Sequence, residues 1–545
     1  MAKFRITRRD IIAGAAASAA LPLASCEKPP KVAYDHGVAS GDPLADRVIL
    51  WTRVAPVVSP DEAPPAIVPV RWEVAEDDSF ARIVAKGSAE ASAAADYTVK
   101  VDAAGLQPGR GYAYRFRVGD QLSPAGATRT LPEGAVDSLS LAVVSCSSYP
   151  HGFYNVYRAL SERDDIAAVI HLGDYIYEYD KDTYKSDQAI ALGRVIEPEG
   201  ELLTVDDYRA RYGVYRRDPD LQAAHARHPF ICVWDDHEIA NDAWKDGAEN
   251  HQEEDGDWVA RRAAALQAYF EWLPIRAVPG EAGRIYRSFD FGDLARLVML
   301  DTRLIGRDRQ ASYEALRAGM APEDFRAQVL NDPARNMLGP AQEAWAAEAL
   351  VGSKERGQPW QLIGQQIIFA DHFSPTDLDI DLDAVPENVA QAIQNAAQLS
   401  KLGFPRSMDK WGAYPVARQR LLDVLAEHAN NAVILTGDSH NAWAFEVGPD
   451  ADPVAVELAT PSVTSAGLEA YVPVDPATLE AAYMARNPNL KYFDAKRRGY
   501  LEVTATPESL TGRFHYVDTI LDKAFTVTSD DAVVSMAGSH RVQLS

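Results

Sequence analysis

Apolar residues recur with two different periods along the chain, and the change of period divides it. Within residues 33–134, short runs at 70–74, 97–101 and 112–118 alternate apolar and polar side chains, in part or throughout. Such alternation is typical of β-strands with one buried face. Turns rich in Gly and Pro, such as 106–109, separate the runs. Residues 33–134 are therefore predicted to form a β-sandwich of the immunoglobulin or fibronectin type III kind.

From residue 139 onward, apolar strand patterns alternate with helical patterns. The predicted strands are 139–144, 167–171, 230–234, 297–300, 361–369 and 432–436, and helical patterns cover 258–269, 340–350 and 416–427. This alternation predicts an α/β layered fold. Two polar, acidic stretches, 180–225 and 373–412, are expected to form loops or short helices over a site. The C-terminal stretch 487–545 either completes the core or forms a lid.

The N-terminus has the pattern of an export signal. Basic residues, including the pair Arg8 and Arg9, precede a mildly apolar stretch of small residues that Pro22 ends. The apolar run is too short to span a bilayer. The paired arginines indicate a twin-arginine signal, which exports proteins already folded. Residues 1–32 are expected to be this signal and a linker. The protein then meets the twin-arginine translocase during export and becomes periplasmic or extracellular.

The cysteines are few, and each needs a separate reason. Residues 23–26 resemble a lipoprotein processing box, in which Cys26 would be lipidated; the alternative is cleavage near Ala24, with Cys26 discarded. Beyond the signal only Cys146 and Cys232 remain, and two cysteines are too few to form a disulfide framework. A free cysteine in an oxidising compartment calls for burial or for metal binding.

Net charge narrows the range of partners. The 545 residues carry 54 Lys and Arg against 79 Asp and Glu, a net charge of −25, although the signal region is basic. An acidic body argues against generic binding to nucleic acid or to anionic membranes. If the substrate is anionic, metal ions or arginines must oppose this field locally.

Side chains that bind metals follow several of the predicted strands. After four strands come, in order, Cys146; Asp174 and Tyr177; Asp235, Asp236 and His237; and Asp438 and His440. Ligands in α/β sheets bind outside the carboxyl ends of strands, so these groups can converge. One Asp after a strand is more often a helix N-cap. Four such strand ends predict a metal site, because crowded carboxylates repel one another without cations.

The mixture of donors indicates the type of metal. Carboxylates alone suit Ca²⁺ or Mg²⁺. Thiolate, imidazole and phenolate favour a transition metal, and phenolate with carboxylate suits Fe³⁺. Asp174 and Tyr177 are three residues apart, so one short turn can aim both at one ion, and Asp174 is placed to bridge two ions.

Taken together, the motifs resemble a known family. They are 36–43 (HGVASGDP), Ser145-Cys146, 171–179 (HLGDYIYEY), 234–238 (WDDHE) and 437–440 (GDSH). In this order, behind a twin-arginine signal, they are similar to PhoD-type alkaline phosphatases and phosphodiesterases of the calcineurin-like metallophosphoesterase superfamily. The similarity runs from about His36 to the C-terminal region.

The resemblance implies a fold and a set of metal ligands. It implies a four-layer α/β/β/α core over residues 135–545, behind the β-domain at 33–134, and it implies Fe³⁺ and Ca²⁺ (two calcium ions). By motif, the iron ligands would be Cys146, Asp174, Tyr177 and His440. The calcium ligands would be Asp174, Asp236 and Asp438, with Asp235 and Asn241 as weaker candidates.

The resemblance also implies a mechanism. Metal ions would polarise the phosphoryl oxygens and generate a hydroxide or oxide for in-line attack. His237, Asp174, Arg158 and Asn241 are the candidate catalytic residues; His237 would be an acid or a positioning group, or would only orient a metal ligand. Arg158, Asn155 and His372 are candidates for binding the substrate, although an exposed helix arginine is the plainer interpretation of Arg158. Arg303 and His372 follow strand-like runs and are candidate neighbours of the site.

The function expected on this basis is an exported, monomeric alkaline phosphatase acting on small phosphate esters. The first alternative is a phosphodiesterase or phospholipase D-like activity on phospholipid or nucleotide diesters, with the same metal centre. The second is a surface adhesion or phosphate-binding protein with a degenerate site. The intact set of donors speaks against this second alternative.

Overall fold

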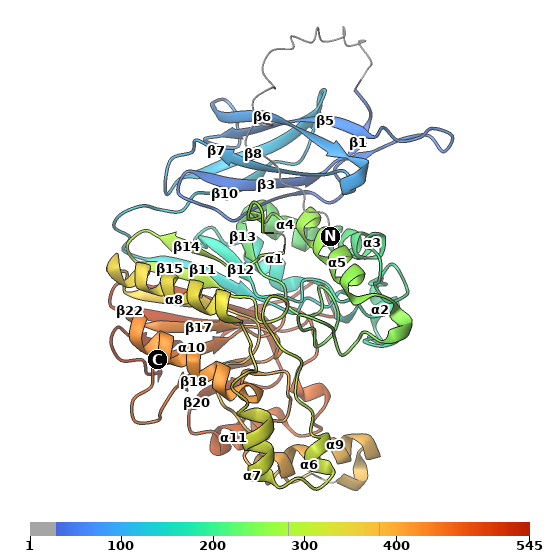
Figure 1. Ribbon diagram of the computed structural model, residues 1–545. Coiled ribbons are helices and arrows are strands. Elements are labelled where there is room, and N and C mark those ends of the chain that lie inside the picture. The colour runs from blue at the N-terminus through green and yellow to red at the C-terminus, as the bar shows by residue number, and fades with distance from the viewer. Residues whose placement is uncertain (1–28, 282, 381) are drawn as a thin grey trace, which may run out of the picture.

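The computed structural model describes residues 29–281, 283–380 and 382–545 and shows a mixed α/β protein built on several sheets (Figure 1). The predicted export signal, through residue 28, and the Cys26 lipidation site lie outside the described residues. Within those residues, every helix is too short or too polar to cross a membrane.

The N-terminal strands enclose an apolar cluster of their own. One antiparallel sheet runs in the order β10 (Gly126–Arg129), β8 (Gly111–Val118), β5 (Ile67–Ala75), β6 (Ile83–Ser92), with β9 (Gln121–Leu122) beside β8. Facing strands are β2 (Val38–Gly41), β3 (Arg47–Arg53) and β7 (Thr98–Ala104). Leu50 of β3, Val70 of β5 and Tyr114 of β8 are buried in the same cluster. The predicted strands at 70–74, 97–101 and 112–118 overlap β5, β7 and β8.

Strand β2 connects this region to the main sheet, because it pairs with β3 on one side and, in parallel, with β13 on the other. The main sheet has the order β25-β24-β22-β21-β11-β12-β13-β2-β3-β7, with β23 beside β22. Its remaining strands are β11 (Leu139–Val144), β12 (Ala168–His171), β13 (Pro229–Cys232), β21 (Arg498–Ala505), β22 (Ser509–Val517), β23 (Val527–Ser529), β24 (Val533–Met536) and β25 (Gln543–Leu544).

A second large sheet packs against the main one. Its order is β14 (Arg287–Phe291), β15 (Ala295–Met299), β16 (Trp360–Gly364), β17 (Ala432–Thr436), β19 (Ala455–Ala459), β18 (Ala442–Val447), β20 (Leu490–Asp494). Val143 and Ile170 of the main sheet share one apolar cluster with Leu362 and Leu435 of this sheet. The two sheets therefore bury a common core between them.

Helices pack on both large sheets. Helices α1 (Asn155–Ser161), α3 (Val205–Arg216), α4 (Pro219–Arg227) and α5 (Trp258–Trp272) contribute to the cluster of the main sheet. Helices α8 (Pro340–Glu355), α10 (Pro415–His428) and α11 (Pro476–Arg486) pack with the second sheet. Helix α2 (Ala189–Leu192) follows the β12 loop. Helices α6 (Glu314–Arg317), α7 (Pro322–Phe325) and α9 (Glu387–Lys401) project from the body (Figure 1).

Two sequence predictions change in the structure. The strand expected over 361–369 ends at Gly364. Past this point the Gln365 side chain donates to Ile367 O, and the Gln366 side chain accepts from Thr302 N, so 365–369 forms a loop braced by side chains. The stretch 180–225, expected to be loops or short helices, contains the whole of the 12-residue helix α3, which buries Arg211 and Arg216 and so lacks a clear apolar stripe.

The C-terminal stretch completes the core. Strand β21 pairs antiparallel with β11 along its length, and β22 pairs with β21. The sequence left open whether 487–545 completes the core or forms a lid, and the strand pairing shows that it completes the core.

The close contact between β2 and β13 leaves no room for a side chain at Gly41, so a larger residue there should lower the stability of the fold. A Cβ at Gly41 would lie 2.4 Å from the Pro274 carbonyl oxygen and 2.5 Å from that of Phe230, both rigid backbone atoms. Gly41→Ala is expected to cost about 1–3 kcal/mol of unfolding free energy. Gly111→Ala, whose Cβ would have its nearest neighbour at 3.9 Å, should change it by less than about 0.5 kcal/mol. Denaturant unfolding of both variants checks this; equal stabilities would contradict it.

Candidate metal centre

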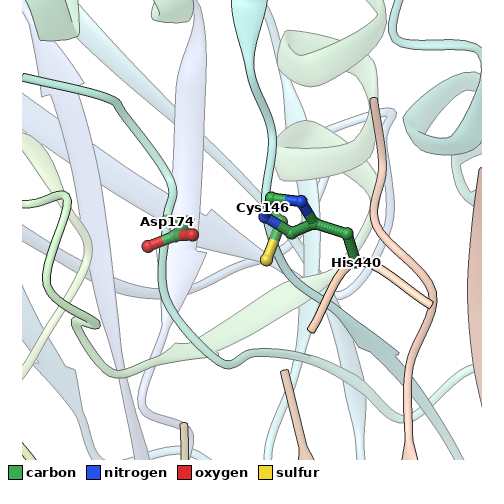
Figure 2. A group of neighbouring side chains, drawn as sticks. All are labelled: Cys146, Asp174 and His440. Atoms are coloured by element: carbon green, nitrogen blue, oxygen red, sulfur yellow. The ribbon is translucent and has the colours of Figure 1, made fainter. Parts of the chain in front are cut away.

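The carboxyl ends of strands from both large sheets bring the predicted donors together. The Cys146 thiol, an Asp174 oxygen and a His440 nitrogen lie within 4.8 Å of one another. These residues follow β11, β12 and β17, and Figure 2 shows their side chains gathered from separate segments of the chain. The convergence expected from the strand pattern is thus present in the structure.

A second group of donors adjoins the first. Asp174, Asp236 and His237 offer atoms within 4.8 Å of one another, and so do Asp235, Asp236 and Asp438. Asp174 belongs to the group with Cys146 and to the group with Asp236. The donors therefore form one continuous cluster, with Asp174 between its thiol-containing part and its carboxylate-rich part.

The Tyr177 phenol joins the thiol-containing part. Its hydroxyl donates to Asp174 Oδ2 at 3.1 Å and lies 3.5 Å from His440 Nε2 and 2.6 Å from Ser465 Oγ. The side chain is buried. Thiol, phenol, imidazole and carboxylate thus meet at one point, as the spacing of Asp174 and Tyr177 predicted.

Left-handed backbone conformations aim four of these donors. The φ angles are 61° at Cys146, 55° at Asp174, 58° at Asp438 and 64° at His440. Each such conformation is unfavourable for a residue with a Cβ, by about 1–3 kcal/mol, and such residues gather at functional sites. Hydrogen bonds between the loops hold two of them: Cys146 N donates to Gly173 O at 3.1 Å, and Ser147 N donates to Asp174 O at 2.8 Å.

Glu238 holds the loops after β12 and β13 together. Its carboxylate accepts from the backbone N–H groups of Asp174 at 3.1 Å, Tyr175 at 2.6 Å and Asp235 at 2.7 Å. Such charge-assisted bonds are stronger than neutral ones. One buried side chain therefore fixes the distance between Asp174 and Asp235.

Glu178 has the same kind of role for His237. Its Oε2 lies 2.7 Å from His237 Nδ1, and its Oε1 accepts from Asn241 N at 2.7 Å and from Asn250 Nδ2 at 3.0 Å. With Nδ1–H bound to the carboxylate, His237 keeps Nε2 for another partner. Both glutamates lie inside motifs noted in the sequence, although neither was assigned a role there.

The cluster is short of positive charge. Burial, together with repulsion by Asp236, Glu238 and Asp438, raises the pKa of Asp174 well above its usual range, although His237 opposes the shift. Burial also raises the pKa of Asp235, with Arg303 opposing. For Asp236 the attraction of Arg303 and His237 outweighs burial and lowers the pKa to about 2. Burial and the neighbouring Asp174 raise the pKa of the Cys146 thiol.

Unpaired carboxylate oxygens show that the cluster fits bound cations. Asp174 Oδ1 and Asp235 Oδ2 are buried and have no hydrogen-bond partner among the described residues. A buried polar atom without a partner is costly, and a cation would satisfy both oxygens and lower the raised pKa values. The donor set and the missing partners therefore agree on metal binding.

Arg303 is the main cation that the chain itself supplies to the carboxylate-rich part. It is fully buried and pairs with Asp235, with Asp409 at 2.6 Å and with Asp438 at 3.3 Å. The sequence marked Arg303 only as a neighbour and did not single out Asp409 or Asp242, which form a further group of neighbouring carboxylates with Asp236. These two lie in irregular loops, where no periodic pattern marks them.

Three predicted site residues make other contacts in the structure. Arg158 is exposed on α1 and faces Glu162 at 3.6 Å, in line with the plainer interpretation of this residue. Asn155 is buried, and its Nδ2 donates to the carbonyl oxygens of Thr519 and Asp522, so it ties down the C-terminal segment. The Asn241 side chain donates to Glu249 at 3.0 Å. Helical or loop position alone does not tell which way such side chains point.

His372 lies beside the cluster. It lines a cavity of about 360 Å³ whose wall also includes Asp438, Ser439 and His440. Its ring packs against Trp443, with 5.5 Å between centroids. The cavity therefore connects the donor cluster with space for a ligand.

Comparison with known proteins agrees with this geometry. The family model described as PhoD-like phosphatase matches residues 141–514, and the model for the N-terminal domain of PhoD-like phosphatases matches residues 18–132. Alkaline phosphatase D of Bacillus subtilis (strain 168) is 37% identical over 487 residues, which cover 87% of this chain and 76% of that protein. A solved structure of PhoD is 32% identical, with a TM-score of 0.77, over 94% of this chain and 92% of that chain.

Substitution of Asp174 tests whether the cluster is built for cations. In chelator, Asp174→Asn should melt at a higher temperature than the unchanged protein, because it removes a buried carboxyl that repels its neighbours. Without chelator the order should reverse, since the variant loses a shared ligand and bound metal no longer stabilises it. Thermal melts with an element-resolved metal assay check both.

The control is Asp187→Asn, an exposed position, which should leave melting and metal content unchanged. A variant at Asp174 that keeps the full metal content would show that this carboxylate does not join the two parts of the cluster.

Proposed function

Because this chain belongs to the PhoD-like phosphatase family and is a phosphoric ester hydrolase, we propose that metal ions held by its donor cluster carry the reaction. The observation behind the proposal is the continuous cluster joined at Asp174, with buried carboxylate oxygens that lack partners. A binding protein with a degenerate site would not need so complete a set of donors.

Two kinds of ion suit the two parts of the cluster. Cys146, Asp174, Tyr177 and His440 would hold Fe³⁺, for which phenolate and carboxylate are suitable ligands. Asp174, Asp236 and Asp438 would hold Ca²⁺, two ions in all, since that part offers carboxylates. Asp235 is a further ligand candidate through its unpaired Oδ2. Asn241 is a weaker one, because its side chain is engaged with Glu249.

The bound ions would neutralise the phosphoryl oxygens and acidify the attacking water. The chain's own residues do the rest. Glu178 fixes the ring of His237, so that Nε2 is free to position the substrate or to give a proton to the leaving oxygen. Glu238 keeps the β12 and β13 loops at a constant separation, which preserves the spacing of donors around the reacting group.

Several wider features of the sequence prediction also belong to this proposal. The core at 135–545 would be a four-layer α/β/β/α arrangement, supported by two packed sheets with helices against each. The region 33–134 would be a β-sandwich that shares β2, β3 and β7 with the main sheet. Its own apolar cluster and the gap between the two family matches support this. Residues 1–32 would direct export through the twin-arginine translocase, with Cys26 lipidated or removed.

The proposed substrates are small phosphate esters, cleaved by a monomer. Activity should disappear when chelator removes the ions and return with Fe³⁺ and Ca²⁺ together, because neither half of the cluster suits both ions. Rates on 4-nitrophenyl phosphate and on bis(4-nitrophenyl) phosphate, before and after metal removal, measure this and separate monoesterase from diesterase. Full turnover in protein shown to be free of metal would refute the metal-based mechanism.

Tyr177 supplies a spectroscopic test of the iron assignment. A phenolate on Fe³⁺ absorbs visible light, so the metal-loaded protein should be coloured and Tyr177→Phe should lose the band. Tyr179→Phe is the matched control, because the ring of Tyr179 packs against His237 and Tyr184 but its hydroxyl has no bond to the cluster. An active, iron-containing protein without colour would contradict the assignment of Tyr177.

A further inference from the structure

The cavity beside the cluster is lined by two segments of different character. One is the loop after β17, with Asp438, Ser439 and His440. The other is the polar stretch between α9 and α10, with Arg406 and Lys410, and Lys410 is the cation that acts most strongly on Asp438. A phosphate ester whose phosphoryl group is held at the cluster would therefore have both cations in the cavity that receives its organic part.

Neither of these two cations has a protein partner. Among the described residues, the Lys410 ammonium and the Arg406 guanidinium form no hydrogen bond or ion pair. Other basic groups nearby are paired: Arg307 with Asp409, and Arg418 with Asp371 at 2.7 Å. Burial lowers the pKa of Lys410, Asp438 opposes this, and Arg406 adds to it by repulsion. An anionic ligand would add the direct partner that this ammonium lacks among the described residues.

Both acidic side chains that line the cavity have a basic neighbour. Asp371 pairs with Arg418, and Asp438 pairs with Arg303. Burial, with a contribution from Lys410, lowers the pKa of His372 to about 3, so that this ring is neutral. Arg406 and Lys410 therefore make part of the cavity locally positive in a chain whose net charge is −25. A positively charged patch on an otherwise negatively charged protein favours the binding of an anionic ligand.

Aromatic and apolar groups complete the cavity. Trp443 is buried and stacks on Phe493, which fixes its ring, whereas Tyr471 is half exposed at the cavity wall. Leu468 also lines the cavity. The volume of about 360 Å³ accommodates a group of the size of a substituted benzene ring.

We propose that this cavity binds the alcohol part of the substrate and selects phosphate esters whose alcohol carries a second anionic group, a carboxylate or a further phosphate, next to a planar or apolar body. The inference rests on the proposed function, since it needs the reacting phosphoryl group at the cluster. Lys410 and Arg406 are specificity-determining residues for that second anion.

A matched pair of substrates tests this selection. 4-Carboxyphenyl phosphate and 4-carbamoylphenyl phosphate are similar in shape and leaving group but differ in the distal charge. The metal-loaded protein should show a kcat/KM roughly tenfold higher for the carboxylate, in keeping with about 1.4 kcal/mol from a charge-assisted contact. Lys410→Met and Arg406→Gln should each bring the ratio toward one by lowering kcat/KM for the carboxylate while leaving the amide substrate nearly unchanged.

The control is Lys401→Met, at the end of α9 and outside the wall of this cavity, which should keep the full ratio. Arg406 is exposed, so its variant keeps the test valid if Lys410→Met fails to fold. Equal rates on both substrates would overturn the proposal. So would a Lys410→Met variant that loses rate equally on both, because Lys410 would then serve the reacting phosphoryl group. If no phosphate ester at all is cleaved, the proposed function itself fails and the subsite with it.

Discussion

Repulsion among buried carboxylates is the constraint on which this structure depends. Asp174, Asp235, Asp236 and Asp438 are drawn from both large sheets into one cluster, and Arg303 alone touches three of them. Two of their oxygens lack any partner among the described residues. Burying these carboxylates lowers the free energy of unfolding, and the large apolar core offsets that loss. Bound cations would raise the free energy of unfolding again. Metal binding and fold stability are therefore two aspects of the same electrostatic problem.

The rest of the molecule keeps that cluster in shape. Glu238 and Glu178 use their carboxylates on backbone N–H groups and on His237 instead of on an ion. Left-handed backbone at Cys146, Asp174, Asp438 and His440 aims the donors. Lys410 and Arg406, which have no ion-pair partner among the described residues, line the adjoining cavity. The site thus combines an excess of negative charge, where ions are needed, with an excess of positive charge where the substrate's organic part lies.

The sequence predicted the donors that lie in loops just after strands, because strand ends in a layered α/β fold meet at one edge of the sheet. Examples are Cys146, Asp174, Tyr177 and His440. It also predicted the strand–helix alternation and β11 to the residue. The sequence did not predict where side chains point: Arg158 faces Glu162, Asn241 Nδ2 donates to Glu249, and α3 buries Arg211 and Arg216. Strand β6 escaped notice because its small and charged residues, at 83–92, lack apolar alternation. Asp409 joins the cluster through a loop that no local pattern describes.

The position of β21 has a consequence for how the chain is made. Strand β11 begins at residue 139, yet its antiparallel neighbour begins at residue 498. Until the ribosome has produced nearly the whole polypeptide, β11 keeps an open edge, and pairing across such a sequence separation is slow. The main sheet is therefore completed only late in synthesis, when β21 becomes available to pair with β11.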